Sequence, residues 1–149
     1  MTGTEVQPPP LTGQDIAEAQ GAVRGLLDQI LHSTGTTSEE YVTLRVVAFR
    51  GPWADRPALA GYLAAQPQLG LDEAGITALL DRLQERGLIT EAGPVTLTAA
   101  GTDLHASLAA AVQQSTARLY AGFDGDDLAV AHRVLAGITQ RANELRQDL

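Results

Sequence analysis

The sequence predicts a mostly α-helical fold with one small β-hairpin, and two observations carry this prediction. Hydrophobic residues make up 44% of the 149 residues but aromatic residues only 4%, so the apolar side chains are mainly Leu, Ala, Val and Ile. Such a mixture favours helices over sheets. In addition, residues 72–101 carry, in order, a helical pattern, a tight turn, two short apolar strands and the start of a new helix.

The overall charge limits the kinds of partner. Ten basic residues, all of them arginine, stand against eighteen acidic residues, for a net charge of −8. A chain of this kind is soluble and repels a polyanion at long range. A local basic patch decides DNA binding, however, so the net charge alone does not exclude it.

The absence of certain residues and patterns excludes several classes of protein. The sequence has no cysteine, which rules out disulfides, thiolate catalysis and cysteine-based zinc sites. It has no membrane-length apolar run and no signal-peptide pattern at Met1. We therefore expect a cytoplasmic protein without a membrane partner.

The first helices follow a flexible arm. Residues 1–10, with three consecutive prolines at Pro8–Pro10, look like an extended arm, and residues 11–149 look like a single domain. Thr12 is a candidate N-cap for a helix that fades at 33–35. Its apolar positions recur at steps of three and four residues: Ile16, Val23, Leu26, Leu27, Ile30 and Leu31.

Two shorter helices come next. The second helix begins at Ser38 and stops at Gly51-Pro52, because proline cannot continue a helix. Its predicted apolar face comprises Tyr41, Leu44, Val47 and Ala48. The third helix spans about 55–65 with Leu59, Tyr62 and Leu63 facing inward, before Pro67 and Gly70 break it.

The next segment combines a helix with a hairpin. Asp72 caps a helix whose apolar stripe is Ile76, Leu79, Leu80 and Leu83. Gly87 stands where a helix C-terminus favours glycine. Residues 88–91 and 95–97 are predicted strands, joined by a turn at 92–94.

Two long helices end the chain. Thr98 caps the first, whose apolar side carries Leu104, Leu108, Val112, Leu119 and Tyr120. The segment 123–127 interrupts it, and the last helix carries Leu128, Val134, Leu135, Ile138, Ala142 and Leu145. The acidic cluster at 124–127 lacks the ligand pattern of a calcium loop and is better explained as a capped helix start.

Two short motifs, in the right order, resemble a known family. Residues 80–89 (LDRLQERGLI) resemble the end of the recognition helix and the first wing strand of the multiple-antibiotic-resistance regulator (MarR) family, and residues 97–101 (LTAAG) resemble its second wing strand and fifth helix. The helix order over 11–147 is also similar. The resemblance implies a winged helix-turn-helix lobe at 38–98 and dimerisation helices at 11–34 and 99–149.

The resemblance also implies partners. Family members are homodimers that place two recognition helices in successive major grooves of palindromic duplex DNA and respond to small phenolic or anionic ligands. On this chain the implied DNA contacts are Thr77, Arg82 and Arg86 on the recognition helix and Arg56 on the helix before it. Long apolar terminal helices in a small chain independently favour a partner surface.

The chain departs from the family pattern in three places. The recognition helix begins with Asp72 and Glu73 where basic residues are usual, the wing tip (92–94) carries no arginine, and the connection 64–69 is longer than a typical turn. Residues 55–98 hold six acidic residues and three arginines. Asp72 and Glu73 also suit a helix N-terminus, and carboxylates accept hydrogen bonds from cytosine, so both interpretations stay open.

A candidate ligand site lies on the second helix. Tyr41, Arg45 and Phe49 recur at four-residue steps, Trp53 follows closely, and His32 ends the first helix. An arginine among aromatic rings suits a planar carboxylate or phenolate. The alternative is that the rings belong to the core and that Arg45 is a surface residue.

Evidence for catalysis is thin. The three histidines show no metal-ligand spacing, and the sequence has neither a Gly-x-Ser-x-Gly motif nor a phosphate-binding glycine loop. We therefore expect no cofactor and no metal. The leading hypothesis is a ligand-responsive regulator, a repressor; the alternative is a relative that has lost DNA recognition and binds or transforms a small aromatic or anionic molecule.

Overall fold

The computed structural model describes residues 11–66 and 69–149. The expected N-terminal arm (1–10) and Pro67 lie outside the described residues. The chain divides into two compact units, Met1–Val112 and Gln113–Leu149. The division falls inside a long helix, and the separation at 98/99 of a winged-helix lobe from dimerisation helices stays a prediction.

Helices α1 (Gly13–His32) and α2 (Ser38–Arg50) both begin with a capping box. The hydroxyl of Thr12 accepts a hydrogen bond from the Asp15 amide, and the Asp15 carboxylate accepts one from the Thr12 amide. Thr37 and Glu40 repeat this capping box at α2. Each box satisfies amides that a helix start leaves unpaired, so the predicted cap at Thr12 is confirmed.

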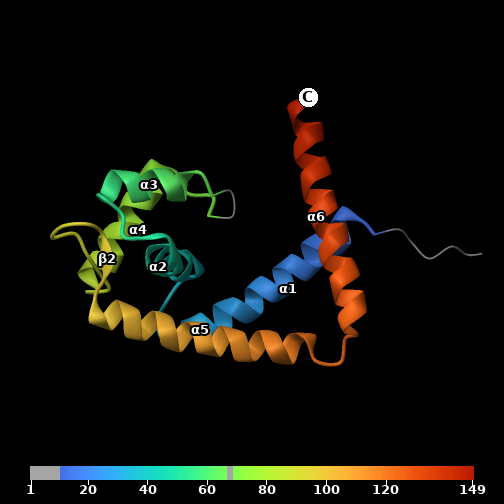
Figure 1. Cartoon of the computed structure of the whole chain (residues 1–149), viewed down its shortest axis with the longest axis horizontal. Coiled ribbons are helices and arrows are strands. Elements are labelled where there is room, and N and C mark those ends of the chain that lie inside the picture. Colours follow the sequence, from blue (N-terminus) through green and yellow to red (C-terminus); the bar gives the residue numbers. More distant parts are fainter. Residues whose placement is uncertain (1–10, 67–68) are drawn as a thin grey trace, which may run out of the picture. The chain divides into compact units, whose positions relative to one another are not determined.

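The helix-turn-helix consists of α3 (Arg56–Ala64), capped by Asp55, and α4 (Glu73–Glu85), capped by Asp72 as predicted. The two helices pack against each other (Figure 1). The chain leaves α4 through Gly87, whose φ of 70° lies in the left-handed region that favours glycine.

The wing is a short antiparallel pair, β1 (Ile89–Thr90) and β2 (Thr96–Leu97), with Ile89 opposite Leu97. A third segment joins it, because the backbones of Trp53 and Val95 exchange two hydrogen bonds. The sequence did not reveal this bridge. It fastens the segment between α2 and α3 to the wing.

The core lies inside the first unit. Its main cluster joins α2, α3, α4 and the wing through Leu44, Val47, Leu59, Leu63, Leu69, Ile76, Leu79, Leu80, Leu83, Leu88, Ile89 and Val95. All four predicted apolar residues of α4 are buried. A smaller cluster joins Leu31, Tyr41 and Leu108. Ala48 was predicted to face inward and is exposed, since α2 turns that position away from both clusters.

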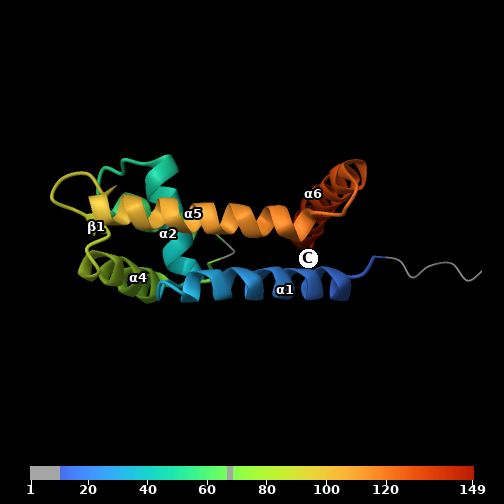
Figure 2. The same cartoon turned by 90° about the horizontal axis from the view of Figure 1, so that it is seen from below.

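Helix α5 (Ala99–Tyr120) begins directly on the wing, as Figure 2 shows. The Thr98 hydroxyl accepts a hydrogen bond from the Gly101 amide and donates one to the Gly87 carbonyl oxygen. A Cβ added at Gly101 would lie 2.0 Å from the Leu88 carbonyl oxygen. Only glycine therefore permits this close approach of two backbones.

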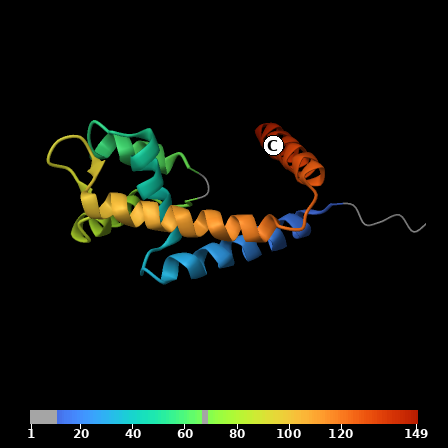
Figure 3. The ribbon, with the colours of Figure 1, turned by 60° about the horizontal axis from the view of Figure 1, so that its bottom comes forward.

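The second unit contains the end of α5 and helix α6 (Gly125–Gln147) (Figure 3). Asp124 caps α6 by accepting from the Asp126 amide, which confirms the expected capped start. No residue of α6 is buried. Its apolar residues Val130, Val134, Leu135, Ile138 and Leu145 remain exposed in the single chain.

We predict that Gly101→Ala destabilises the fold by about 1–3 kcal/mol, because the methyl group would overlap the Leu88 carbonyl oxygen. Gly61→Ala is the matched control: an added Cβ there meets nothing within 4 Å, and alanine stabilises a helix by about 0.5–1 kcal/mol relative to glycine. Urea unfolding of both variants measures the difference. Equal stability of the two variants would contradict the close approach.

Candidate functional site

The outward face of α4 is the candidate DNA-recognition surface. Thr77 and Arg82 are exposed on it, as are Glu73, Asp81 and Glu85. The Thr77 hydroxyl donates to the Glu73 carbonyl oxygen, one turn earlier. The side chain of Arg82 has no hydrogen-bond or ion-pair partner among the described residues, so its guanidinium is available to another molecule.

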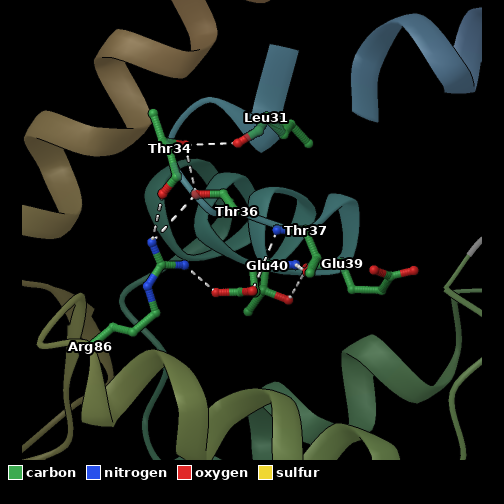
Figure 4. A network of polar contacts seen from close by, with 8 residues as sticks. Leu31, Thr34, Thr36, Thr37, Glu39, Glu40 and Arg86 are labelled. Atoms are coloured by element: carbon green, nitrogen blue, oxygen red, sulfur yellow. Dashed lines mark hydrogen bonds and ion pairs between the residues drawn. The ribbon is translucent and has the colours of Figure 1, made fainter. Parts of the chain in front are cut away.

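The guanidinium of Arg86, unlike that of Arg82, is bound within the chain. Its guanidinium forms an ion pair with the carboxylate of Glu40, whose side chain is only 5% exposed. It also donates, at 3.5 Å, to the Thr34 carbonyl oxygen and to the Thr36 hydroxyl (Figure 4). Glu40 at the same time caps α2. Arg86 thus ties the end of α4 to the junction of α1 and α2.

Arg56 is engaged in a similar way. Its guanidinium binds both carboxylate oxygens of Glu91 at 2.7 and 3.1 Å, the carboxylate of Asp81 at 2.7 Å and the amide oxygen of Gln84 at 3.2 Å. The hydrogen bonds that Arg56 donates to Glu91, followed by the one it donates to Asp81, raise the pKa of the Arg56 guanidinium against the opposing effect of burial. Arg56 therefore links α3 to α4 and to the base of the wing.

These contacts reduce the unpaired positive charge on α3 and α4 of the winged-helix lobe (residues 38–98). Of the three arginines between residues 55 and 98, two are neutralised by carboxylates of the same chain, and Arg82 is the one without a partner among the described residues. The wing tip, Ala92–Pro94, is exposed and carries no charge. Phosphate neutralisation by α3, α4 and the wing therefore depends on Arg82.

A groove of about 420 Å³ runs along α2. Tyr41, Arg45 and Phe49 line it, as the four-residue spacing predicted, together with Val42, Val46, Arg50, Tyr62 and Gln66. Arg50 adds a second positive charge, with its guanidinium carbon 5.9 Å from the centre of the Tyr62 ring. Two arginines beside aromatic rings suit a planar anion.

The other two predicted ligand residues lie elsewhere. His32 is exposed at the end of α1 and does not line the groove. Trp53 also does not line it, because its backbone pairs with the wing and its ring packs 5.2 Å from the ring of Tyr62. Trp53 therefore packs against Tyr62, which does line the groove.

His105 of α5 was missed as a site residue. Its ring lies 6.1 Å from Tyr41, stacked, and 5.6 Å from Phe49, edge-on. Only 8% of the residue is exposed, and its Nε2 atom has no hydrogen-bond partner among the described residues. Burial, followed by the charge of Arg45, lowers the pKa of His105. The neutral imidazole is therefore favoured.

Sequence signals for two of the missed residues existed. His105 stands four residues after Gly101 and three before Leu108, which puts it on the inward stripe of α5. Glu40 ends the Thr37-Ser38-Glu39-Glu40 sequence, which is a capping-box pattern. The partner of Glu40 is 46 residues away, and no local pattern indicates such a pair.

The described residues contain neither a metal-binding cluster nor a membrane-spanning helix. No group of three or more His, Asp or Glu side chains is arranged to hold a metal ion. Among the described helices, none combines the length and apolar character needed to cross a membrane.

Comparison with known proteins identifies the fold. No family model matches the sequence, and no curated protein matches it significantly. Solved structures do match. A MarR-family protein from Mycobacterium tuberculosis in complex with DNA is 25% identical, with 87% of this chain and 98% of that chain covered and a TM-score of 0.65. The reduced form of MarR from E. coli is 21% identical, with coverages of 89% and 95% and a TM-score of 0.68, and CouR from Rhodococcus jostii bound to p-coumaroyl-CoA is 23% identical, with coverages of 83% and 87% and a TM-score of 0.63. The chain therefore has the winged-helix fold of the MarR family, as the motifs predicted.

We predict that Arg86→Ala lowers the free energy of unfolding by about 1–3 kcal/mol, because it leaves the buried Glu40 carboxylate without its partner. The matched change Arg82→Ala, which removes an unpaired surface arginine, costs less than about 0.5 kcal/mol. Adding Glu40→Gln to Arg86→Ala restores part of the loss, because the buried group is then uncharged. Equal effects of the two arginine substitutions in thermal unfolding would refute the structural role of Arg86.

Proposed function

We propose that this protein, which has the winged-helix fold of the MarR family, is a ligand-responsive transcriptional regulator that binds palindromic duplex DNA as a homodimer. The observation that carries the proposal is the exposed face of α4, on which Thr77 is exposed and Arg82 has no hydrogen-bond or ion-pair partner among the described residues, in a fold similar to that of a DNA-bound protein. A helix presented in this way suits the major groove.

Exposed apolar residues on the long helices support dimerisation. Val23 and Leu26 of α1 are exposed, and α6 keeps an apolar stripe at Val134, Leu135 and Ile138. Such stripes on a single chain favour burial against a partner. We propose that 11–34 and 99–149 form the dimer interface and that 38–98 form the DNA-binding lobe.

The groove on α2 supports the response to a ligand. Tyr41, Arg45 and Phe49 line it, and the structurally similar CouR was solved with p-coumaroyl-CoA bound. We propose a small aromatic or anionic ligand. A dimer seated on a palindrome excludes other proteins from that DNA, so we propose repression that the ligand relieves.

We predict that Arg82→Ala abolishes or weakens the binding of upstream intergenic DNA at least tenfold in a gel-shift titration at low salt. Because α3 and α4 leave one unpaired arginine per chain, a dimer neutralises about two phosphates with them, and the logarithm of the binding constant falls with the logarithm of salt concentration with a slope of about −2.

The control for this experiment is Arg50→Ala, which removes an exposed arginine from α2, outside the proposed dimer interface and outside α3, α4 and the wing. It should leave the DNA affinity unchanged. Unchanged affinity of Arg82→Ala, in a protein that does bind its upstream DNA specifically, would exclude the proposed role of this residue. A complete lack of specific binding at low salt would instead favour the second function below.

The neutralised arginines support a second candidate function. Arg56 and Arg86 are bound by carboxylates, and Glu73, Asp81 and Glu85 are exposed on α4, where they repel phosphates. In this alternative the protein has lost DNA recognition and uses the α2 groove to bind or transform a small aromatic or anionic molecule.

The role of the groove can be tested with aromatic carboxylates as probes. We predict that Arg45→Ala weakens their binding at least tenfold in calorimetric titrations, because it removes a charge-assisted hydrogen bond. Arg141→Ala on α6 is the control and should have no effect. Equal affinity of the Arg45 variant and the unmodified protein would exclude Arg45 from the site.

A further inference from the structure

Arg56 lies at the edge of the candidate recognition surface. It lines a hollow between α3 and α4 together with Glu73 and Thr77 of the recognition helix. Its side chain is 27% exposed, and that of its partner Asp81 on α4 is 52% exposed. A phosphate group that approaches this part of α4 therefore meets Arg56 and Asp81 at the same place.

The N–H groups of Arg56 are nearly all engaged within the chain. A guanidinium has five of them. Nε donates to one carboxylate oxygen of Glu91 at 2.7 Å, and Nη2 donates to the other at 3.1 Å and to the amide oxygen of Gln84 at 3.2 Å. Nη1 donates to Asp81 at 2.7 Å, which leaves a single N–H group without an acceptor among the described residues. A bidentate contact with phosphate needs two parallel N–H groups, so Arg56 cannot form it in this arrangement.

The local charge also opposes a phosphate contact. Arg56 carries one positive charge, whereas Glu91 and Asp81 carry one negative charge each, so the three side chains together have a net charge of −1. The Glu91 side chain is only 20% exposed, and salt screens a partly buried pair less than an exposed one. A phosphate must therefore displace carboxylates that bind the guanidinium as a phosphate would.

We propose that Glu91 and Asp81 compete with DNA phosphate for Arg56 and so hold the winged-helix lobe in a state of low DNA affinity. The inference rests on the proposed DNA-binding function and identifies the residues that limit it. Arg56 is a phosphate-binding residue whose charge is unavailable while both carboxylates are bound. The two carboxylates set how many phosphates the lobe neutralises.

The experiment uses the full chain and random-sequence duplex DNA, because phosphate contacts do not depend on base sequence. The double variant Asp81→Asn/Glu91→Gln keeps the shape of both side chains and removes both charges. We expect it to bind the duplex about tenfold more tightly, or better, in fluorescence-anisotropy titrations over a range of salt concentrations. The slope of the logarithm of the binding constant against the logarithm of salt should steepen by about two, since each protomer of the proposed dimer adds one contact.

A matched control separates the release of Arg56 from a general change in charge. Glu73→Gln/Glu85→Gln removes the same charge from two exposed carboxylates of α4 that have no ion-pair partner among the described residues. It should leave the salt slope unchanged. Arg56→Ala is then added to both double variants. It should return the first to the slope of the unmodified protein and leave the slope of the control as it was.

The Arg56 contacts also join α3 to α4 and the wing, so circular dichroism must show that each variant is folded. The single variants Asp81→Asn and Glu91→Gln serve in place of the double variant if it unfolds, and each should give part of the gain. An unchanged slope in the variants of Asp81 and Glu91, an equal steepening in the control, or an equal effect of Arg56→Ala in both backgrounds would overturn the proposal.

The proposed function fails on a different result. A lack of specific binding to the upstream intergenic DNA would reject the regulator, whereas the comparisons on random duplex need no specific site. Specific binding combined with an unchanged salt slope in the variants of Asp81 and Glu91 would retain the regulator and reject the competition for Arg56.

Discussion

The winged-helix lobe depends on the burial of the Glu40 carboxylate against Arg86. Glu40 is almost inaccessible to water, and an isolated buried charge is strongly unfavourable. The guanidinium of Arg86 compensates it, and Arg86 also reaches the Thr34 carbonyl oxygen and the Thr36 hydroxyl. Because Glu40 caps α2 and Arg86 is the C-cap of α4, this ion pair joins the two helices at their ends, in addition to the hydrophobic cluster that they share.

Two of the arginines in the lobe stabilise its tertiary structure, and this leaves little unpaired positive charge on α3 and α4. Arg56 holds α3, α4 and the wing by binding Glu91 and Asp81, much as Arg86 holds α4 to α2. Both arginines thus contribute to tertiary structure. The exposed surface of α4 is left with one unpaired arginine, Arg82, among several carboxylates, so any phosphate contact made by α3 and α4 depends on this one side chain.

Local patterns predicted most of the fold. The caps at Thr12 and Asp72, the apolar stripe of α4 and the hairpin after Gly87 each depend on residues a few positions apart, and each was confirmed. The bridge between Trp53 and Val95 and the ion pairs of Arg56 and Arg86 join residues 25 to 46 positions apart, so no local periodicity predicts them. Of the candidate ligand residues, Tyr41, Arg45 and Phe49 line one groove because they share one helix, whereas His32 and Trp53 do not line it; their role in ligand binding stays a prediction.

The junction at Thr98 and Gly101 has a mechanical consequence. The Thr98 hydroxyl holds the carbonyl group just beyond α4 and the amide in the first turn of α5, and Gly101 rests against the Leu88 backbone without an intervening side chain. The end of α4 and the start of α5 cannot easily move apart, since direct backbone contacts cannot lengthen as flexible side-chain contacts do. A rotation of α4 about its own axis must therefore carry the first turns of α5 with it, and the two helices behave as a single lever.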